Sequence, residues 1–153
     1  MSIIPNYVPS QYKTVNLHLI VKDADHALDF YNRAFGAEVV LRLQDPSGVV
    51  VHAEIKIADT IIMLAEEHPG YNRSPETLGG TSAVIQIYTG DVEGFFEEAV
   101  KAGATVLAPI KEEFYGDRVG KLQDPFGHVW VVATHVEDLT ASEIQKRFNE
   151  LYP

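Results

Sequence analysis

The chain has 153 residues, of which 46% are hydrophobic, and a formal net charge of −10 at pH 7. This acidic balance argues against nucleic acid or an anionic membrane as a partner. The absence of cysteine excludes disulfides and thiolate chemistry. No apolar run approaches the roughly 20 residues that span a bilayer, and the N-terminus lacks a signal-peptide pattern. We therefore expect a soluble, cytoplasmic protein.

The predicted elements occur twice in the same order, displaced by about 68 residues, the distance from Asp23 to Asp91. The first set comprises a strand at 15–21, a helix at 24–35 and strands at 37–43, 49–57 and 60–65. The second set comprises a strand at 82–89, a helix at 92–102 and strands at 104–110, 117–123 and 128–134. Each helix follows an aspartate suited to capping it and ends at a glycine. Such repetition predicts two copies of one structural unit.

The pattern divides the chain into five segments. We predict an N-terminal arm at 1–13, a first module at 14–66, a linker rich in Pro, Gly and polar residues at 67–81, and a second module at 82–135. The last segment, 136–153, contains a helix that starts with a capping-box pattern at Thr140. Its apolar stripe, Ile144, Phe148 and Leu151, is expected to pack on the body of the protein.

Alternation along the strands predicts which side chains share a face. If the turn at 58–59 pairs Ile57 with Thr60, Glu54 faces the same side as Met63. By the same alternation the polar side of the sheets carries His18, His52, Gln86 and Tyr88. Trp130 is expected on the helix-covered face, in the core. Each module thus has one apolar face and one mixed face, and two such modules that curl toward each other would enclose a cavity.

The two strand-helix-strand-strand-strand units, with Asp124-Pro125-Phe126-Gly127-His128 entering the last strand, resemble the vicinal oxygen chelate superfamily. This group includes glyoxalases, extradiol dioxygenases and bleomycin-resistance proteins. Residues 52–55, 115–118 and 124–130 are similar to its PhnB-like branch. The resemblance covers about 14–135. It implies an α+β fold of two βαβββ modules whose curled mixed sheets form a cavity, with the C-terminal helix in addition.

Superfamily members with metal chemistry supply one His, Glu or Gln from the first and last strand of each module. Carried over, these four positions are Asn16, Met63, Val84 and Val131. Only Asn16 could coordinate a divalent ion, and only weakly, so the resemblance implies that the usual metal site is missing. We expect no metal and no other cofactor.

A relocated divalent metal is the alternative, using His18, His52 or Glu54. Two strand spacings place the first two roughly 10 Å apart, too far to share an ion unless the sheet curls strongly. The competing interpretation is that these are polar groups of the cavity wall.

Glu54 and His52 are the candidate catalytic residues, because a buried carboxylate beside a histidine can act in acid–base chemistry. The alternative is a solvent-exposed polar face on which Lys56 offsets the charge. The candidate ligand-binding residues are His18, Met63, Gln86, Tyr88, Phe114 and Arg118. For Arg118 the alternative is an ion pair with Asp117 or Glu112. His135 is interpreted as a surface residue.

The leading functional hypothesis is binding of a small organic molecule in the cavity without the usual metal, as the resemblance to bleomycin-resistance proteins implies. The alternative is a metal-dependent lyase, isomerase or dioxygenase with a non-standard ligand set. A third possibility is a structural role with the cavity filled by side chains. The resemblance also implies a homodimer.

Overall fold

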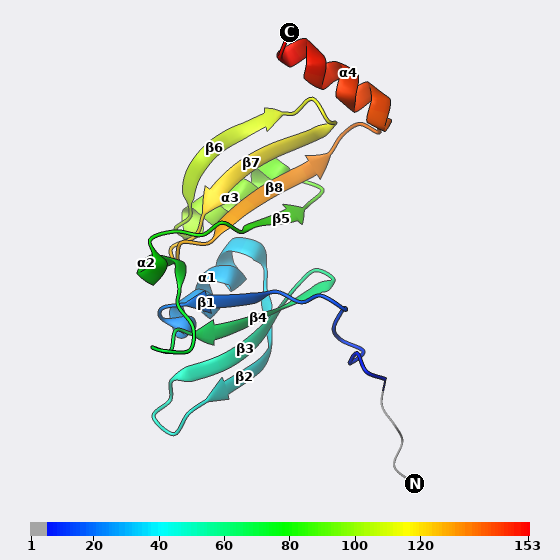
Figure 1. Ribbon diagram of the computed structural model, residues 1–153. Helices are drawn as coiled ribbons and strands as arrows, with labels where there is room; N and C mark the ends of the chain where they lie inside the picture. The colour runs from blue at the N-terminus through cyan, green and yellow to red at the C-terminus, as the bar shows by residue number, and fades with distance from the viewer. Residues whose placement is uncertain (1–5) are drawn as a thin grey trace. The chain divides into compact units, whose positions relative to one another are not determined.

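A computed structural model describes residues 6–153 of the chain (Figure 1). They form two compact units, divided between Gly80 and Thr81, each built around a four-stranded sheet. Each unit has the predicted order of strand, helix and three strands, so the repeat is confirmed.

The first unit has strand order β1-β4-β3-β2, with β1 parallel to β4 and the other pairs antiparallel. Its elements are β1 (His18–Val21), α1 (Ala24–Phe35), β2 (Glu38–Gln44), β3 (Val50–Ile57), β4 (Thr60–Glu66) and α2 (Pro75–Leu78). Helix α1 packs on β3 and β4 and buries Phe30 and Tyr31 completely. The Glu66 carboxylate accepts the backbone N–H groups of Asp23 and Ala24 at 2.9 and 2.6 Å, which ties the start of α1 to the end of β4.

The second unit repeats this topology in the order β5-β8-β7-β6. Its elements are β5 (Val84–Tyr88), α3 (Val92–Ala102), β6 (Thr105–Glu112), β7 (Asp117–Gln123), β8 (Val129–His135) and α4 (Ala141–Leu151). Helix α3 packs on β6, β7 and β8. Trp130 is fully buried and donates its indole N–H to Asp124 Oδ2 at 2.8 Å, so its predicted place in the core is confirmed.

Two local differences from the expected elements have physical causes. The first strand starts at His18 rather than at 15, because the Asn16 side chain bonds to the backbone of Lys13 and closes a turn there. The segment expected as a linker contains the helix α2, which Ser74 caps at its N-terminus and Gly79 ends in a left-handed conformation.

The C-terminal helix α4 begins with the predicted capping box at Thr140. Arg147 holds it to Glu137 through two bonds of 2.7 and 2.8 Å, and the Phe148 ring lies 5.5 Å from the Phe114 ring. No residue of α4 is buried, and Leu151 remains 57% exposed, so the predicted stripe packs on the second unit only in part. Among residues 6–153, no helix has the length and apolar character needed to cross a membrane.

Candidate functional site

The turn at Ala58 and Asp59 sets the polar face of the first sheet. Ile57 pairs with Thr60, Glu54 with Met63, and Met63 with His18. These pairs place His18, Met63 and Glu54 in one row across β1, β4 and β3, facing away from α1, as the alternation predicted.

Glu54 is nevertheless almost completely buried, with 6% exposure. The reason is the N-terminal arm, from which Tyr12 donates its hydroxyl to Glu54 Oε1. This hydrogen bond raises the pKa of Tyr12 above its usual value. Glu54 is therefore not part of a solvent-exposed polar face, which was the alternative interpretation.

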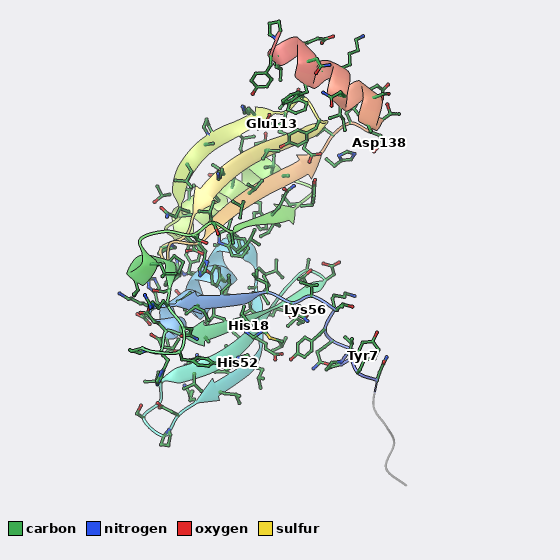
Figure 2. All side chains as sticks on the ribbon, viewed as in Figure 1. Tyr7, His18, His52, Lys56, Glu113 and Asp138 are labelled. Atoms are coloured by element: carbon green, nitrogen blue, oxygen red, sulfur yellow. The ribbon has the colours of Figure 1, made fainter. Side chains whose placement is uncertain are left out.

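His18 and His52, both labelled in Figure 2, lie on this face near Glu54. The His52 Nε2 atom is 3.5 Å from Glu54 Oε1, and the His18 and His52 ring centroids are 6.5 Å apart. This separation is shorter than the expected 10 Å, because the two side chains approach each other across β4, which separates their strands. Glu54 and His52 are thus neighbours, as predicted.

A groove of about 490 Å³ opens beside Glu54. The arm forms one wall, and strands β2, β3 and β4 with their connecting turn form the other. Its lining residues are Ser10, Gln11, Lys13, Val40, Glu54, Lys56, Asp59 and Ile61. A concave surface with a few converging polar groups is the usual form of a small-molecule site.

In the second unit, Gln86 pairs with Val131 and Tyr88 with Ala133, so both candidates lie on the sheet face opposite α3. Tyr88 donates its hydroxyl to Asp117 Oδ2 at 2.7 Å, and this bond raises the pKa of Tyr88. A cavity shared by this face and that of the first unit stays a prediction.

Asp117, the buried first residue of β7, also binds His135. The two residues pair directly across β7 and β8, and Asp117 Oδ1 lies 2.7 Å from His135 Nδ1. His135 Nε2 lies 2.7 Å from Asp138 Oδ1. The bonds to Asp117 and then to Asp138 raise the pKa of His135 above its ordinary value of 6.5. His135 lies at the surface, as predicted, and is also part of a polar network.

Two candidates lie away from these faces. Arg118 pairs with Thr134 on the side of α3, and its guanidinium binds Glu93 rather than Asp117 or Glu112. The Phe114 ring packs against α4, where it lines a groove of about 400 Å³. Ligand binding by either residue remains a prediction.

The four positions that the superfamily uses for metal do not supply a suitable donor set. The Asn16 amide is bound to the backbone of Lys13, Met63 offers a thioether, and Val84 and Val131 offer no donor. Within the described part of the chain, no group of three or more His, Cys, Asp or Glu side chains could hold an ion.

Sequence reasoning missed Tyr12 and the role of Asp117 and His135. Tyr12 lies in an irregular arm, where no periodicity indicates its contact with Glu54. The Asp117–His135 pair could have been found, because the predicted strands 117–123 and 128–134 imply an antiparallel register that brings their far ends together.

The sequence model of the "Glyoxalase/Bleomycin resistance protein/Dioxygenase superfamily" matches residues 13–132. The uncharacterized protein Rv0887c of Mycobacterium tuberculosis is 39% identical over 132 residues, covering 84% of this chain and 78% of the relative. The uncharacterized protein Mb0911c of Mycobacterium bovis is also 39% identical, covering 84% and 87%.

Solved structures with the same fold include TioX from Micromonospora sp. ML1, at 26% identity and a TM-score of 0.64, covering 84% of this chain and all of TioX. The fosfomycin resistance protein FosX of Listeria monocytogenes, solved as a mutant with Mn(II) and a dihydroxypropylphosphonic acid, is 21% identical with a TM-score of 0.58. That match covers 89% of this chain and 97% of FosX and supports the fold alone.

Proposed function

Because the chain belongs to the glyoxalase/bleomycin resistance protein/dioxygenase superfamily, we propose that it binds a small organic molecule in the groove at Glu54, without the usual superfamily metal. The observation that carries this proposal is a buried carboxylate that lines an open groove and whose hydrogen-bond donor comes from the irregular arm.

Glu54 favours a ligand that donates hydrogen bonds or carries a positive charge. An ionised carboxylate is only an acceptor, and a charge-assisted bond to it contributes about 1.5–3 kcal/mol. The Tyr12 hydroxyl now occupies this acceptor, and a ligand ammonium or hydroxyl group would replace it. His52, at 3.5 Å, can provide a second polar contact. The acidic net charge of the chain also attracts cations.

A thermal-shift screen with cationic antibiotics, in buffer containing EDTA, tests the proposal. Hits are then measured by calorimetry on the full chain and on Glu54→Gln. The matched control is Glu38→Gln, which removes an exposed carboxylate from the same sheet. Affinity is expected to fall about 10–100-fold in the first variant and to stay unchanged in the second. A panel without any hit, or equal affinity in both variants, would contradict the proposal.

Elemental analysis of the purified protein tests the alternative, a metal-dependent lyase, isomerase or dioxygenase. A stoichiometric divalent metal that is lost on replacement of His52 would favour this alternative and overturn metal-free binding. The PhnB-like assignment, the cytoplasmic location and the homodimer also remain proposals. Light scattering at micromolar concentration that gives the monomer mass of 17.0 kDa would remove the homodimer.

A further inference from the structure

We propose that Tyr88, Asp117 and His135 form a second ligand site, in the unit Thr81–Pro153, which binds the carboxylate of a small organic molecule in place of the Asp138 side chain. None of these residues lines the Glu54 groove, and the inference does not depend on the function proposed there.

The buried Asp117 carboxylate fixes the His135 ring. One of its oxygens lies 2.7 Å from His135 Nδ1, and the other accepts the Tyr88 hydroxyl at 2.7 Å. Asp117 is only 4% exposed, and strand pairing places it directly opposite His135. A histidine held at Nδ1 by a buried carboxylate presents its Nε2 atom in a defined direction.

The Asp138 side chain shows what the Nε2 atom of His135 binds. Its Oδ1 atom lies 2.7 Å from Nε2, so both ring nitrogens of His135 face carboxylate oxygens. A ring nitrogen must carry a proton to bond to such an acceptor, so this geometry belongs to the imidazolium form. The raised pKa of His135 agrees with it. The Asp138 carboxylate therefore marks the position that the carboxylate of a ligand would take.

An external carboxylate can compete for this position. The Asp138 side chain is fully exposed and lies in the segment between β8 and α4 (Figure 2). Ion pairs of such exposed groups contribute little to stability. The His135 side chain is itself 51% exposed, so a ligand can reach Nε2.

The other acidic groups near His135 are paired or uncharged, so the imidazolium can still attract an anionic ligand. Of the nearby acids, Glu113 is paired with Lys111 at 3.2 Å and Glu137 with Arg147 at 2.7 Å. The Tyr115 hydroxyl, whose pKa is raised by burial and then by Glu113 and Asp117, remains uncharged at neutral pH.

Tyr88 adds an apolar contact surface to the site. This residue is 61% exposed although its hydroxyl is bound to Asp117, so the ring can cover part of an aromatic ligand. An aromatic carboxylate is therefore the most suitable probe.

The test follows the His135 ring protons by NMR at pH 6 while benzoate is added to the full chain. Benzamide, which has nearly the same shape and no charge, is the control ligand. Asp138→Asn removes the competing carboxylate, so the apparent Kd for benzoate should fall at least about fivefold, whereas benzamide should shift nothing. Binding should weaken as the pH rises through the raised pKa of His135.

Two further variants distinguish benzoate binding at this site from nonspecific binding to the protein surface. His135→Gln should abolish benzoate binding while the chain remains folded, and Glu54→Gln should leave it unchanged. The inference is overturned if benzoate binds equally well to the wild type and to Asp138→Asn, if benzamide competes with it, or if binding survives His135→Gln. Loss of benzoate binding in Glu54→Gln would also overturn it, because binding would then require a residue outside the proposed site.

Discussion

Each of the two units contains a buried carboxylate that accepts a tyrosine hydroxyl, but the two carboxylates occupy different positions in the shared fold. In the first unit, Glu54 lies inside β3 and accepts the hydroxyl of Tyr12, which comes from outside the sheet. In the second unit, Asp117 begins β7 and accepts the hydroxyl of Tyr88, which belongs to the sheet. The strand position of Glu54 is occupied in the second unit by Lys121, which pairs with Val131.

The contacts of the histidine beside each carboxylate also differ between the two units. His52 lies 3.5 Å from Glu54, whereas His135 lies 2.7 Å from Asp117 and also contacts Asp138. The two units therefore share the packing of helix on sheet but not the positions of polar groups. In the first network the tyrosine comes from the irregular arm, whereas the second network has three bonds, one of them to Asp138 in the segment after β8.

Gly116→Ala should disturb the second network most strongly. Gly116 has a φ of 94°, and an added Cβ would lie 2.3 Å from the Glu137 carbonyl oxygen, next to Asp117. We expect the free energy of unfolding to fall by about 2–4 kcal/mol in a urea titration. The control is Gly48→Ala, with a φ of 90° and open space around the Cβ, which should cost only about 1 kcal/mol. Equal losses of unfolding free energy in the two variants would show that the contact with Glu137 does not contribute to the destabilisation.

Asp117→Asn should have the next largest effect. It removes the charge that holds His135, so the free energy of unfolding should fall by about 1–3 kcal/mol and the pKa of His135 should move back toward 6.5. Chemical denaturation and an NMR titration measure the two changes. Glu113→Gln, at the partly buried partner of Lys111, is the control and should change both much less. An unchanged His135 pKa in Asp117→Asn would show that Asp117 does not stabilise the imidazolium.

The stability of the second unit should depend on pH through His135. Its folded pKa is raised, so the stabilisation is complete below the unfolded value of about 6.5 and is lost as the pH rises through the folded value. The difference in urea midpoint between the wild type and His135→Gln should therefore shrink from about pH 6 to about pH 9. A difference in urea midpoint that grows with pH would contradict the predicted direction of the pH dependence.

Tyr12→Phe should have the smallest effect on folding. It leaves the ring in place and removes the donor to Glu54. Because water in the adjoining groove can then bond to the carboxylate, the urea midpoint should fall only slightly. Because the carboxylate is then free, a ligand found in the screen should bind as tightly or a few times more tightly in calorimetry. A large loss of affinity would show that the Tyr12 hydroxyl contacts the ligand instead of competing with it.

The sequence predicted the fold well because its signals are local. Capping aspartates, terminal glycines and apolar stripes depend only on neighbouring residues, and both main helices, Ala24–Phe35 and Val92–Ala102, have the predicted bounds. The turn at Ala58 and Asp59 then determines the register and places Glu54 and His52 on one face.

The site was less predictable because its decisive contacts are long-range. Tyr12 reaches Glu54 across 42 positions of the chain, and Arg118 reaches Glu93 across 25, and neither contact leaves a periodic signal. Alternation assigns a residue to a face but cannot show whether an irregular segment covers it.

Calorimetric titration of a screened ligand into wild type and Glu54→Gln, each with and without EDTA, tests the central claim most directly. We predict that EDTA leaves wild-type affinity unchanged, and that the variant binds about 10–100-fold more weakly although it folds normally. Binding that disappears with EDTA, or equal affinity in the two proteins, would contradict metal-independent recognition by Glu54.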